Sequence, residues 1–163
     1  MDSQSRYLSP IGTIRVTANA MGVTSARFVE EDGGNDHSFE EPNEHTERCM
    51  VELDRYFKGK QRYFHTPYMI QGTAFQQRVW AYVHHLEYGN TTSYSDIARA
   101  IGFPNHARAV GNALSKNPVA IMLPCHRVVK KDGQLNAYAW GTSRKQWLLD
   151  HEHRTMDVLA KGI

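Results

Sequence analysis

The hydrophobic pattern of this chain changes near residue 72, and that change limits the folds open to it. Residues 6–30 alternate between apolar and polar side chains, with a turn at 19–22, as β-strands do. From residue 73 onwards, apolar side chains recur at helical spacing in short segments. Residues 63–72 follow neither pattern and predict a linker. We therefore expect an α+β protein with a small N-terminal sheet domain and a mainly helical C-terminal domain.

One helix is expected in the N-terminal part. Cys49, Leu53 and Tyr56 recur at helical spacing, and Gly59 ends the pattern. Cys49 lies on the apolar face of this helix, so we expect it in the core. Residues 30–44, before the helix, are acidic and contain glycine, which is typical of a loop.

The C-terminal part contains clear helix signals. Thr73 and Gln76 have the spacing of a capping box, and Gly89 is the expected end of that helix. A terminal helix is expected from Ser143.

Two short helices between them have the pattern of a helix-turn-helix. Ser93 and Asp96 cap the first, which we expect to end at Gly102, and the second covers residues 107–114. Small side chains on the second helix would let it approach a nucleic-acid backbone closely, although small residues also serve helix packing.

Charge is distributed unevenly along the chain. Residues 1–74 hold 8 basic and 11 acidic residues, and residues 75–145 hold 9 basic and 3 acidic residues, so their net charges are −3 and +6. The whole chain carries only +2. The basic block fits a polyanionic partner of modest, salt-sensitive affinity, and it fits a solvated cationic surface equally well.

Composition argues against several protein classes. Two cysteines do not make a disulfide framework, no apolar run is long enough to span a membrane, and residues 1–10 lack a signal-peptide core. We expect an intracellular protein with reduced thiols. The histidines, His65 included, show no persuasive metal-ligand spacing with the cysteines, so no metal is expected.

Residues 124–129 read PCHRVV and place a histidine directly after a cysteine. A thiol is a nucleophile only as thiolate, and an imidazole is the usual group that generates one near neutral pH. Most isolated Cys-His pairs are nevertheless a buried cysteine beside a solvated histidine. We expect residues 119–129 to be extended, with an interruption at Pro124, so that Cys125 and His126 point to opposite sides and interact through a water molecule.

The surroundings of this pair favour catalysis. Residues 73–152 resemble the catalytic domain of the O6-alkylguanine-DNA alkyltransferases, also called methylated-DNA–protein-cysteine methyltransferases. Residues 9–12 (SPIG) are more loosely similar to the start of the family's N-terminal domain. The matching segments occur in family order: TAFQQRVW (73–80), YG (88–89), TSY (92–94), ARAVG (107–111), NP (117–118), PCHRVV (124–129), Gly133, Tyr138, WG (140–141), and Lys145 through Leu149 to Glu152.

The resemblance implies direct-reversal DNA repair. The chain would flip O6-alkylguanine, with O4-alkylthymine as an alternative, out of duplex DNA and transfer the alkyl group irreversibly to Cys125. Because a thioether is not readily hydrolysed, each chain would act once, and no cofactor is needed. The expected partner is the minor groove of double-stranded DNA, bound by a monomer. The expected location is the cytoplasm, at the nucleoid in bacteria, or the nucleus in eukaryotes.

The resemblance also implies a domain organisation. Residues 1–70 would form a ribonuclease-H-like α/β domain. Residues 71–163 would form the DNA-binding and alkyl-transfer domain, with a winged-helix-like helix-turn-helix.

Roles for single residues follow from the same resemblance. Glu152 would orient His126, the base that acts on Cys125. Arg108 would fill the gap left by the flipped base, and Tyr94 would steer the flanking phosphate and donate a proton toward the guanine.

Other implied roles concern the loops around the nucleophile. Asn117 would tie the second helix of the helix-turn-helix to the loop that bears Cys125. The remaining residues expected at the DNA or the base are Arg127, Val128, Tyr138 and Trp140.

The loop before Tyr138 departs from the family pattern. It reads Asn136-Ala137 where the family usually has a glycine, so we expect a displaced loop or a left-handed Asn136. Trp140 is bulky, and we expect it to narrow the alkyl pocket. Methyl transfer should then be efficient and benzyl transfer weak.

Two other function classes deserve comparison. A non-catalytic sensor of alkylated bases would lack the cysteine, whereas Cys125 is present. A Cys-His hydrolase or transferase of small molecules would turn over, and it would explain neither Arg108 nor the basic block.

Overall fold

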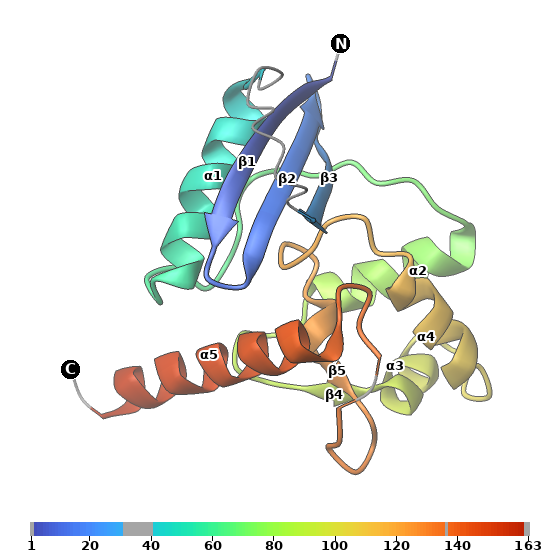
Figure 1. Cartoon of the computed structure of the whole chain (residues 1–163). Helices are drawn as coiled ribbons and strands as arrows, with labels where there is room; N and C mark the ends of the chain where they lie inside the picture. Colours follow the sequence, from blue (N-terminus) through green and yellow to red (C-terminus); the bar gives the residue numbers. More distant parts are fainter. Residues whose placement is uncertain (1, 31–40, 136, 162–163) are drawn as a thin grey trace. The chain divides into compact units, whose positions relative to one another are not determined.

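The computed structural model describes residues 2–30, 41–135 and 137–161 (Figure 1). They form two compact units, one of Met1–Ile70 with Pro118–Ala120 and the other of Gln71–Asn117 with Ile121–Ile163. The expected α+β class is confirmed. The sequence analysis placed the domain boundary after residue 70 and assigned residues 118–120 to the C-terminal domain, whereas here they belong to the first unit. Most of the loop expected at 30–44, and the expected left-handed Asn136, lie outside the described residues.

The first unit is built on a three-stranded antiparallel sheet in the order β1-β2-β3. Its strands are β1 (Ser3–Ser9), β2 (Gly12–Asn19) and β3 (Gly22–Val29). Gly22 begins β3 because the backbone of Pro67 approaches it closely: a Cβ there would lie 2.7 Å from the Pro67 carbonyl oxygen. The register opposes Ser9 to Gly12 and Asn19 to Gly22, so both hairpin turns are short.

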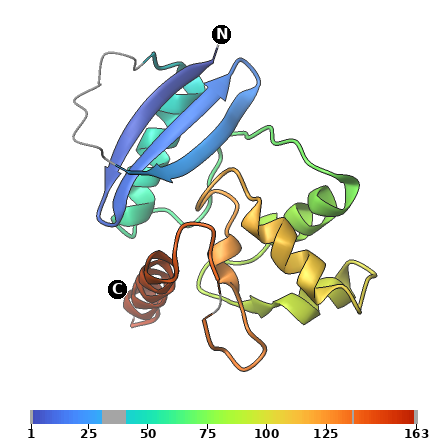
Figure 2. The same cartoon turned by 45° about the vertical axis from the view of Figure 1, so that its right-hand side comes forward.

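Helix α1 (Glu44–Phe57) covers one face of this sheet, as Figure 2 shows. The alternating residues Ile14, Val16 and Ala18 of β2 are fully buried on that face. Cys49 of α1 is buried as well, which confirms its expected place in the core. At the start of the helix, Asn43 and Thr46 cap each other's backbone N–H groups.

Glu52 of α1 forms hydrogen bonds with residues 61–66, which follow that helix. Its carboxylate accepts hydrogen bonds from the backbone N–H groups of His65 and Thr66, both at 2.8 Å, from the Thr66 hydroxyl, and from Gln61 Nε2 at 2.6 Å. Burial by itself raises the pKa of Glu52, but these bonds outweigh it and hold the pKa below its ordinary value. The folded protein therefore stabilises the ionised form of Glu52.

The second unit begins with α2 (Ala74–His84), whose capping box of Thr73 and Gln76 is formed as expected. The helix ends at His84, five residues before Gly89, because His85 and Leu86 form a tighter turn. A buried hydrogen bond from Trp80 Nε1 to the Ala113 carbonyl, at 2.9 Å, ties α2 to α4.

The expected helix-turn-helix consists of α3 (Tyr94–Ala100) and α4 (Ala107–Ser115). Ser93 caps α3 by accepting from the backbone N–H of Asp96. Gly102 has a φ of +89°, a conformation that glycine adopts easily, and lies in the turn between the helices.

The remaining elements of the second unit surround the Cys-His segment. Strand β4 (Thr92–Ser93) pairs in parallel with β5 (Val128–Val129), and a 3₁₀ turn, η2 (Cys125–Arg127), precedes β5. The long helix α5 (Thr142–Ala160) begins one residue before the expected Ser143.

Residues 119–129 were predicted to be extended with an interruption at Pro124, but the chain also turns at Ile121 and at Cys125–Arg127. The Pro124 carbonyl accepts from the Arg127 N–H at 3.0 Å, which closes η2, and Leu123 O accepts from the Cys125 N–H at 2.8 Å. Ile121 lies at a φ of +70°, which is strained for a β-branched residue and turns the chain before it reaches the cysteine. Apolar composition alone does not reveal such turns.

Within the described ranges, no helix combines the length and the apolar character needed to cross a membrane.

Replacing Glu52 with Gln should destabilise the protein by about 2 kcal/mol at neutral pH, because a charged acceptor of several buried bonds is lost. Since the folded pKa lies below the ordinary value of 4.5, this stabilisation is complete above pH 4.5 and disappears as the pH falls through the folded pKa. Urea unfolding of both proteins across this range measures the difference. Glu47→Gln, an exposed change on the same helix, is the control, and an equally large effect there would contradict the assignment.

Candidate active site

Cys125 is the first residue of η2 and is only 4% exposed. Its Sγ accepts a hydrogen bond of 3.2 Å from Asn117 Nδ2, which also donates to the Leu123 carbonyl at 3.0 Å. Asn117 follows the C-terminal end of α4 and is itself buried. A single amide thus connects the end of the helix-turn-helix with the loop that bears the thiol.

Burial raises the pKa of the Cys125 thiol to about 12. The hydrogen bond from Asn117 and the positive charge of Lys145 act in the opposite direction but do not outweigh burial. The resting side chain is therefore a neutral thiol, and a nearby base must take its proton before or during nucleophilic attack.

His126, the next residue, is fully buried and faces Glu152 of α5. The two side chains meet at 2.6 Å between His126 Nε2 and Glu152 Oε2. Because an ionised carboxylate only accepts hydrogen bonds, Nε2 carries the hydrogen and the lone pair lies on Nδ1. Among the described residues, Nδ1 has no hydrogen-bond partner and is buried.

Arg127 completes the surroundings of Glu152. Its Nε and Nη2 donate to the two carboxylate oxygens at 2.8 and 3.0 Å, and its Nη1 donates to the Leu86 carbonyl at 2.8 Å. Gly89 adds a backbone N–H at 3.2 Å. Burial raises the pKa of Glu152, but His126 and Arg127 reverse the effect and hold the pKa far below its usual range.

The same charges determine the protonation state of His126. Burial lowers its pKa below the ordinary value of 6.5, while Glu152 raises it. Arg127 already neutralises that carboxylate, and Lys145 adds a second cation, so burial dominates. His126 is therefore neutral at pH 7 and able to accept a proton at Nδ1.

A pocket of about 530 Å³ opens beside the thiol. It brings together several residues selected from the sequence, namely Cys125, Tyr94 at the start of α3, Arg108 on α4, and Tyr138. The Tyr138 hydroxyl is buried without a hydrogen-bond partner in the described part of the chain. Among the described residues, the lining consists of Tyr94, Ala107, Arg108, Gly111, Asn112, Leu114, Ser115, Cys125, Ala137, Tyr138 and Ala139.

Three residues expected at the DNA or base are absent from the pocket lining. Arg127 is 5% exposed because it binds Glu152, and Val128 is fully buried in β5. Trp140 is absent from the pocket lining and packs edge-on against Tyr138, with ring centroids 5.4 Å apart. The narrowing of the pocket by Trp140 stays a prediction, and Trp140 would act through Tyr138, which lines the pocket.

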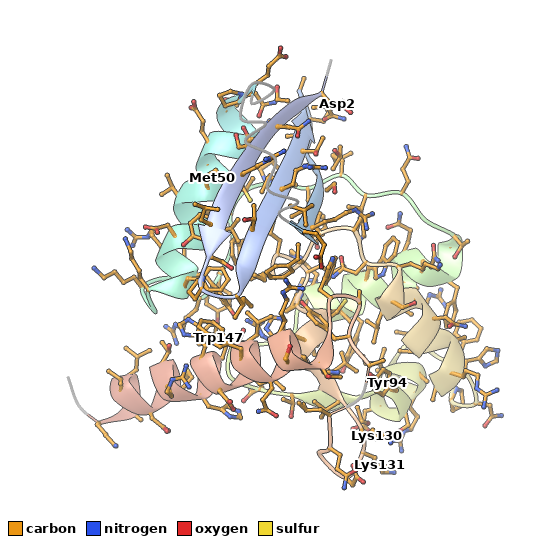
Figure 3. The ribbon with its side chains drawn as sticks, viewed as in Figure 1. Asp2, Met50, Tyr94, Lys130, Lys131 and Trp147 are labelled. Carbon is orange, nitrogen blue, oxygen red and sulfur yellow. The ribbon has the colours of Figure 1, made fainter. Side chains whose placement is uncertain are left out.

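A second hollow, of about 390 Å³, shares Tyr94 and Ala107 with the pocket. Lys130 and Lys131 line it, together with Ser95 and Asp132. Figure 3 shows the two lysines on the loop below Tyr94. The hollow therefore places two lysines next to Tyr94, which lines both hollows.

Lys145 is a buried residue for which the sequence analysis assigned no role. It is 1% exposed, donates from Nζ to the Ala137 carbonyl at 3.4 Å, and lies 5.9 Å from the centre of the Tyr94 ring. Burial lowers its pKa to about 8, although Cys125 counteracts this. Its spacing of seven residues from Glu152 puts both on the same face of α5, a signal that could have identified it.

Comparisons with known proteins match nearly the whole chain. Residues 4–70 match the ribonuclease-like domain of 6-O-methylguanine DNA methyltransferase, and residues 74–154 match its DNA binding domain. The methylated-DNA–protein-cysteine methyltransferase of Mycobacterium tuberculosis is 38% identical over 146 residues, 88% of each chain. The inducible enzyme of that name from Bacillus subtilis is 45% identical over 121 residues, 72% of this chain and 68% of the relative.

Solved structures agree with these sequence matches. The crystal structure of the M. tuberculosis O6-methylguanine methyltransferase has a TM-score of 0.84 at 36% identity and covers 95% of this chain and 94% of that one. A structure of M. tuberculosis OGT in complex with DNA has a TM-score of 0.82 at 36% identity, with 94% and 93% covered. The resemblance inferred from the motifs is confirmed, and the chain belongs to the 6-O-methylguanine DNA methyltransferase family.

Proposed function

We propose that this chain repairs DNA by moving the alkyl group of O6-alkylguanine onto Sγ of Cys125, once per molecule. The observation that carries this assignment is a buried thiol at a pocket, followed directly by a histidine that a buried carboxylate orients. The alkyl carbon exchanges its bond to guanine O6 for a bond to sulfur. The thioether cannot be hydrolysed readily, so the protein stays alkylated.

The thiol proton leaves towards His126. Nδ1 is the atom of that ring with a free lone pair, and a water molecule can carry the proton from Sγ to it. Glu152 stays ionised throughout and stabilises the imidazolium that forms, as its low pKa requires. Asn117 and Lys145 stabilise the developing thiolate, since both lower the pKa of Cys125.

Tyr94 and Arg108 present the base. Guanine must leave the DNA stack before its O6 substituent can reach a buried thiol, and flipping costs a few kcal/mol. Arg108 on α4 fills the vacated position. Tyr94 steers the flanking phosphate, which the adjacent hollow with Lys130 and Lys131 can receive, and its hydroxyl donates a proton toward the guanine.

The proposed mode of DNA binding follows from the need to find a lesion in DNA of any sequence. A repair protein must find its lesion in any sequence, and binding in the minor groove provides affinity with little base readout. Small residues such as Ala107 and Gly111 suit α4 for that approach. The monomer, acting in the cytoplasm or at chromosomal DNA, is the proposed functional form.

Incubation with a duplex containing O6-methylguanine should add one methyl-sized mass increment to the peptide that holds Cys125. Cys125→Ala should still bind the duplex and gain no mass. Cys49→Ala, which removes the other buried thiol, should react like the wild type. Transfer in Cys125→Ala would refute the assignment of the nucleophile.

Glu152→Gln should slow methyl transfer by about 10²-fold or more, because His126 loses its orienting charge. The wild-type rate should fall as the pH drops through the pKa of His126, which lies below 6.5, because protonation removes the base. Single-turnover rates across this pH range measure both effects. Asp150→Asn on the same helix is the control, and an unchanged rate in Glu152→Gln would exclude the proposed base.

Transfer from O6-benzylguanine should be slower than transfer from O6-methylguanine, because Tyr138 occupies the pocket wall and Trp140 holds it in place. Trp140→Ala should increase the benzyl rate relative to the methyl rate by releasing Tyr138. Competition between the two substrates, read by mass, gives the ratio. Equal wild-type rates would contradict this account of pocket size.

A further inference from the structure

The strands of the first unit carry an unusual row of like charges. Arg6 of β1 lies directly opposite Arg15 of β2, and Arg15 lies directly opposite Arg27 of β3. Residues paired in this way point to the same face of a sheet, with Cβ atoms about 5 Å apart. The three guanidinium groups therefore belong to one row across the whole sheet, here called the arginine row.

The row lies on the face of the sheet opposite α1. Residues Ile14 and Val16, on either side of Arg15, are fully buried on the α1 face, so Arg15 points the other way. Within the described part of this unit, α1 covers only one face (Figures 1 and 2). Arg27 is exposed, and Arg6 and Arg15 are half-buried.

The row has no ion-pair partner within the described ranges. None of the ion pairs there includes any of the three arginines. Residues 3–29, which contain all three strands, hold no aspartate or glutamate, and the acidic segment that follows β3 lies mostly outside the described ranges. The Nε of Arg15 is buried and lacks a hydrogen-bond partner in that part of the chain.

Such a row costs stability, because like charges directly opposite each other on a sheet repel. A sheet of this kind would be more stable with neutral polar residues at these positions. Gln4, Thr17 and Ser25 form such a neutral row next to it, at the adjacent paired positions. The arginines are therefore better explained by binding an anion than by supporting the fold.

We propose that the arginine row is a second contact surface for nucleic acid, which binds consecutive phosphates of one DNA strand. Arginine forks match phosphate oxygens, and one strand offers a phosphate every 3.4 Å along the duplex axis, so a row about 10 Å long spans several of them. We name DNA as the polyanion because DNA is the substrate under the proposed function, and this inference rests on that function. The row adds affinity and takes no part in alkyl transfer.

The test compares two charge-matched triple variants of the full chain. Arg6→Gln/Arg15→Gln/Arg27→Gln removes the row, and Arg48→Gln/Lys60→Gln/Arg62→Gln removes three exposed cations of the same unit that lie outside the strands. Binding to a long unmodified duplex is measured by fluorescence anisotropy at several salt concentrations. The row variant should bind more weakly, and its slope of log K against log salt should decrease by about 2 to 3. The control should change by less than about 1.

A labelling experiment locates the contact directly. Phenylglyoxal modification with a peptide-mass readout should show the three arginines of the row protected by the duplex, and Arg48 and Arg62 unprotected. Urea unfolding should show the row variant at least as stable as the wild type, so weaker binding cannot come from misfolding. Equal affinity and slope in the two triple variants, or an unprotected row, would overturn the proposal.

A measurement of methyl transfer distinguishes a failure of this proposal from a failure of the proposed function. At saturating O6-methylguanine duplex, the row variant should alkylate Cys125 at the wild-type rate. If the wild type transfers no methyl group, the proposed function is refuted and the arginine row is not. If the row variant transfers more slowly than the wild type at saturating duplex, the row does more than bind DNA, and its purely binding role is refuted.

Discussion

The buried carboxylate of Glu152 is the interaction on which the rest of the site depends. It accepts from His126, from both sides of the Arg127 fork and from the backbone of Gly89, and so joins α5, η2 and the segment after α2. A buried charge is costly unless every lone pair is satisfied. Here the satisfying donors are also the groups that orient the base, so the stability of this region and its chemistry have the same source.

The thiol is held in a state that suits a protein that reacts once. Burial keeps Cys125 protonated at rest, which protects it from oxidants and from adventitious electrophiles. The means of activation are nevertheless in place, with Asn117 bonded to the sulfur and His126 neutral beside it. Reactivity is therefore restricted to a substrate that enters the pocket lined by Tyr94 and Tyr138.

Local sequence signals predicted the elements of the fold well. The capping residues Thr73 and Ser93 and the spacing of Cys49, Leu53 and Tyr56 identified helices that the structure contains. The errors fell where long-range bonds determine the backbone. Apolar residues on both sides of Pro124 indicated a segment that is extended apart from that proline, whereas hydrogen bonds from Arg127 and Asn117 close the residues around it into a turn.

The sequence by itself determined the family, the candidate nucleophile and the residues expected to assist it, because the motifs from Thr73 to Glu152 occur in family order. Only the tertiary structure decided where those side chains point. It placed Arg127 on Glu152 and Trp140 behind Tyr138, and it brought Lys145 and Tyr94 together. It also aligned Arg6, Arg15 and Arg27 in one row. The sequence gives the chemical type of each side chain, whereas the orientation and burial of a side chain depend on contacts between residues that are distant in the chain.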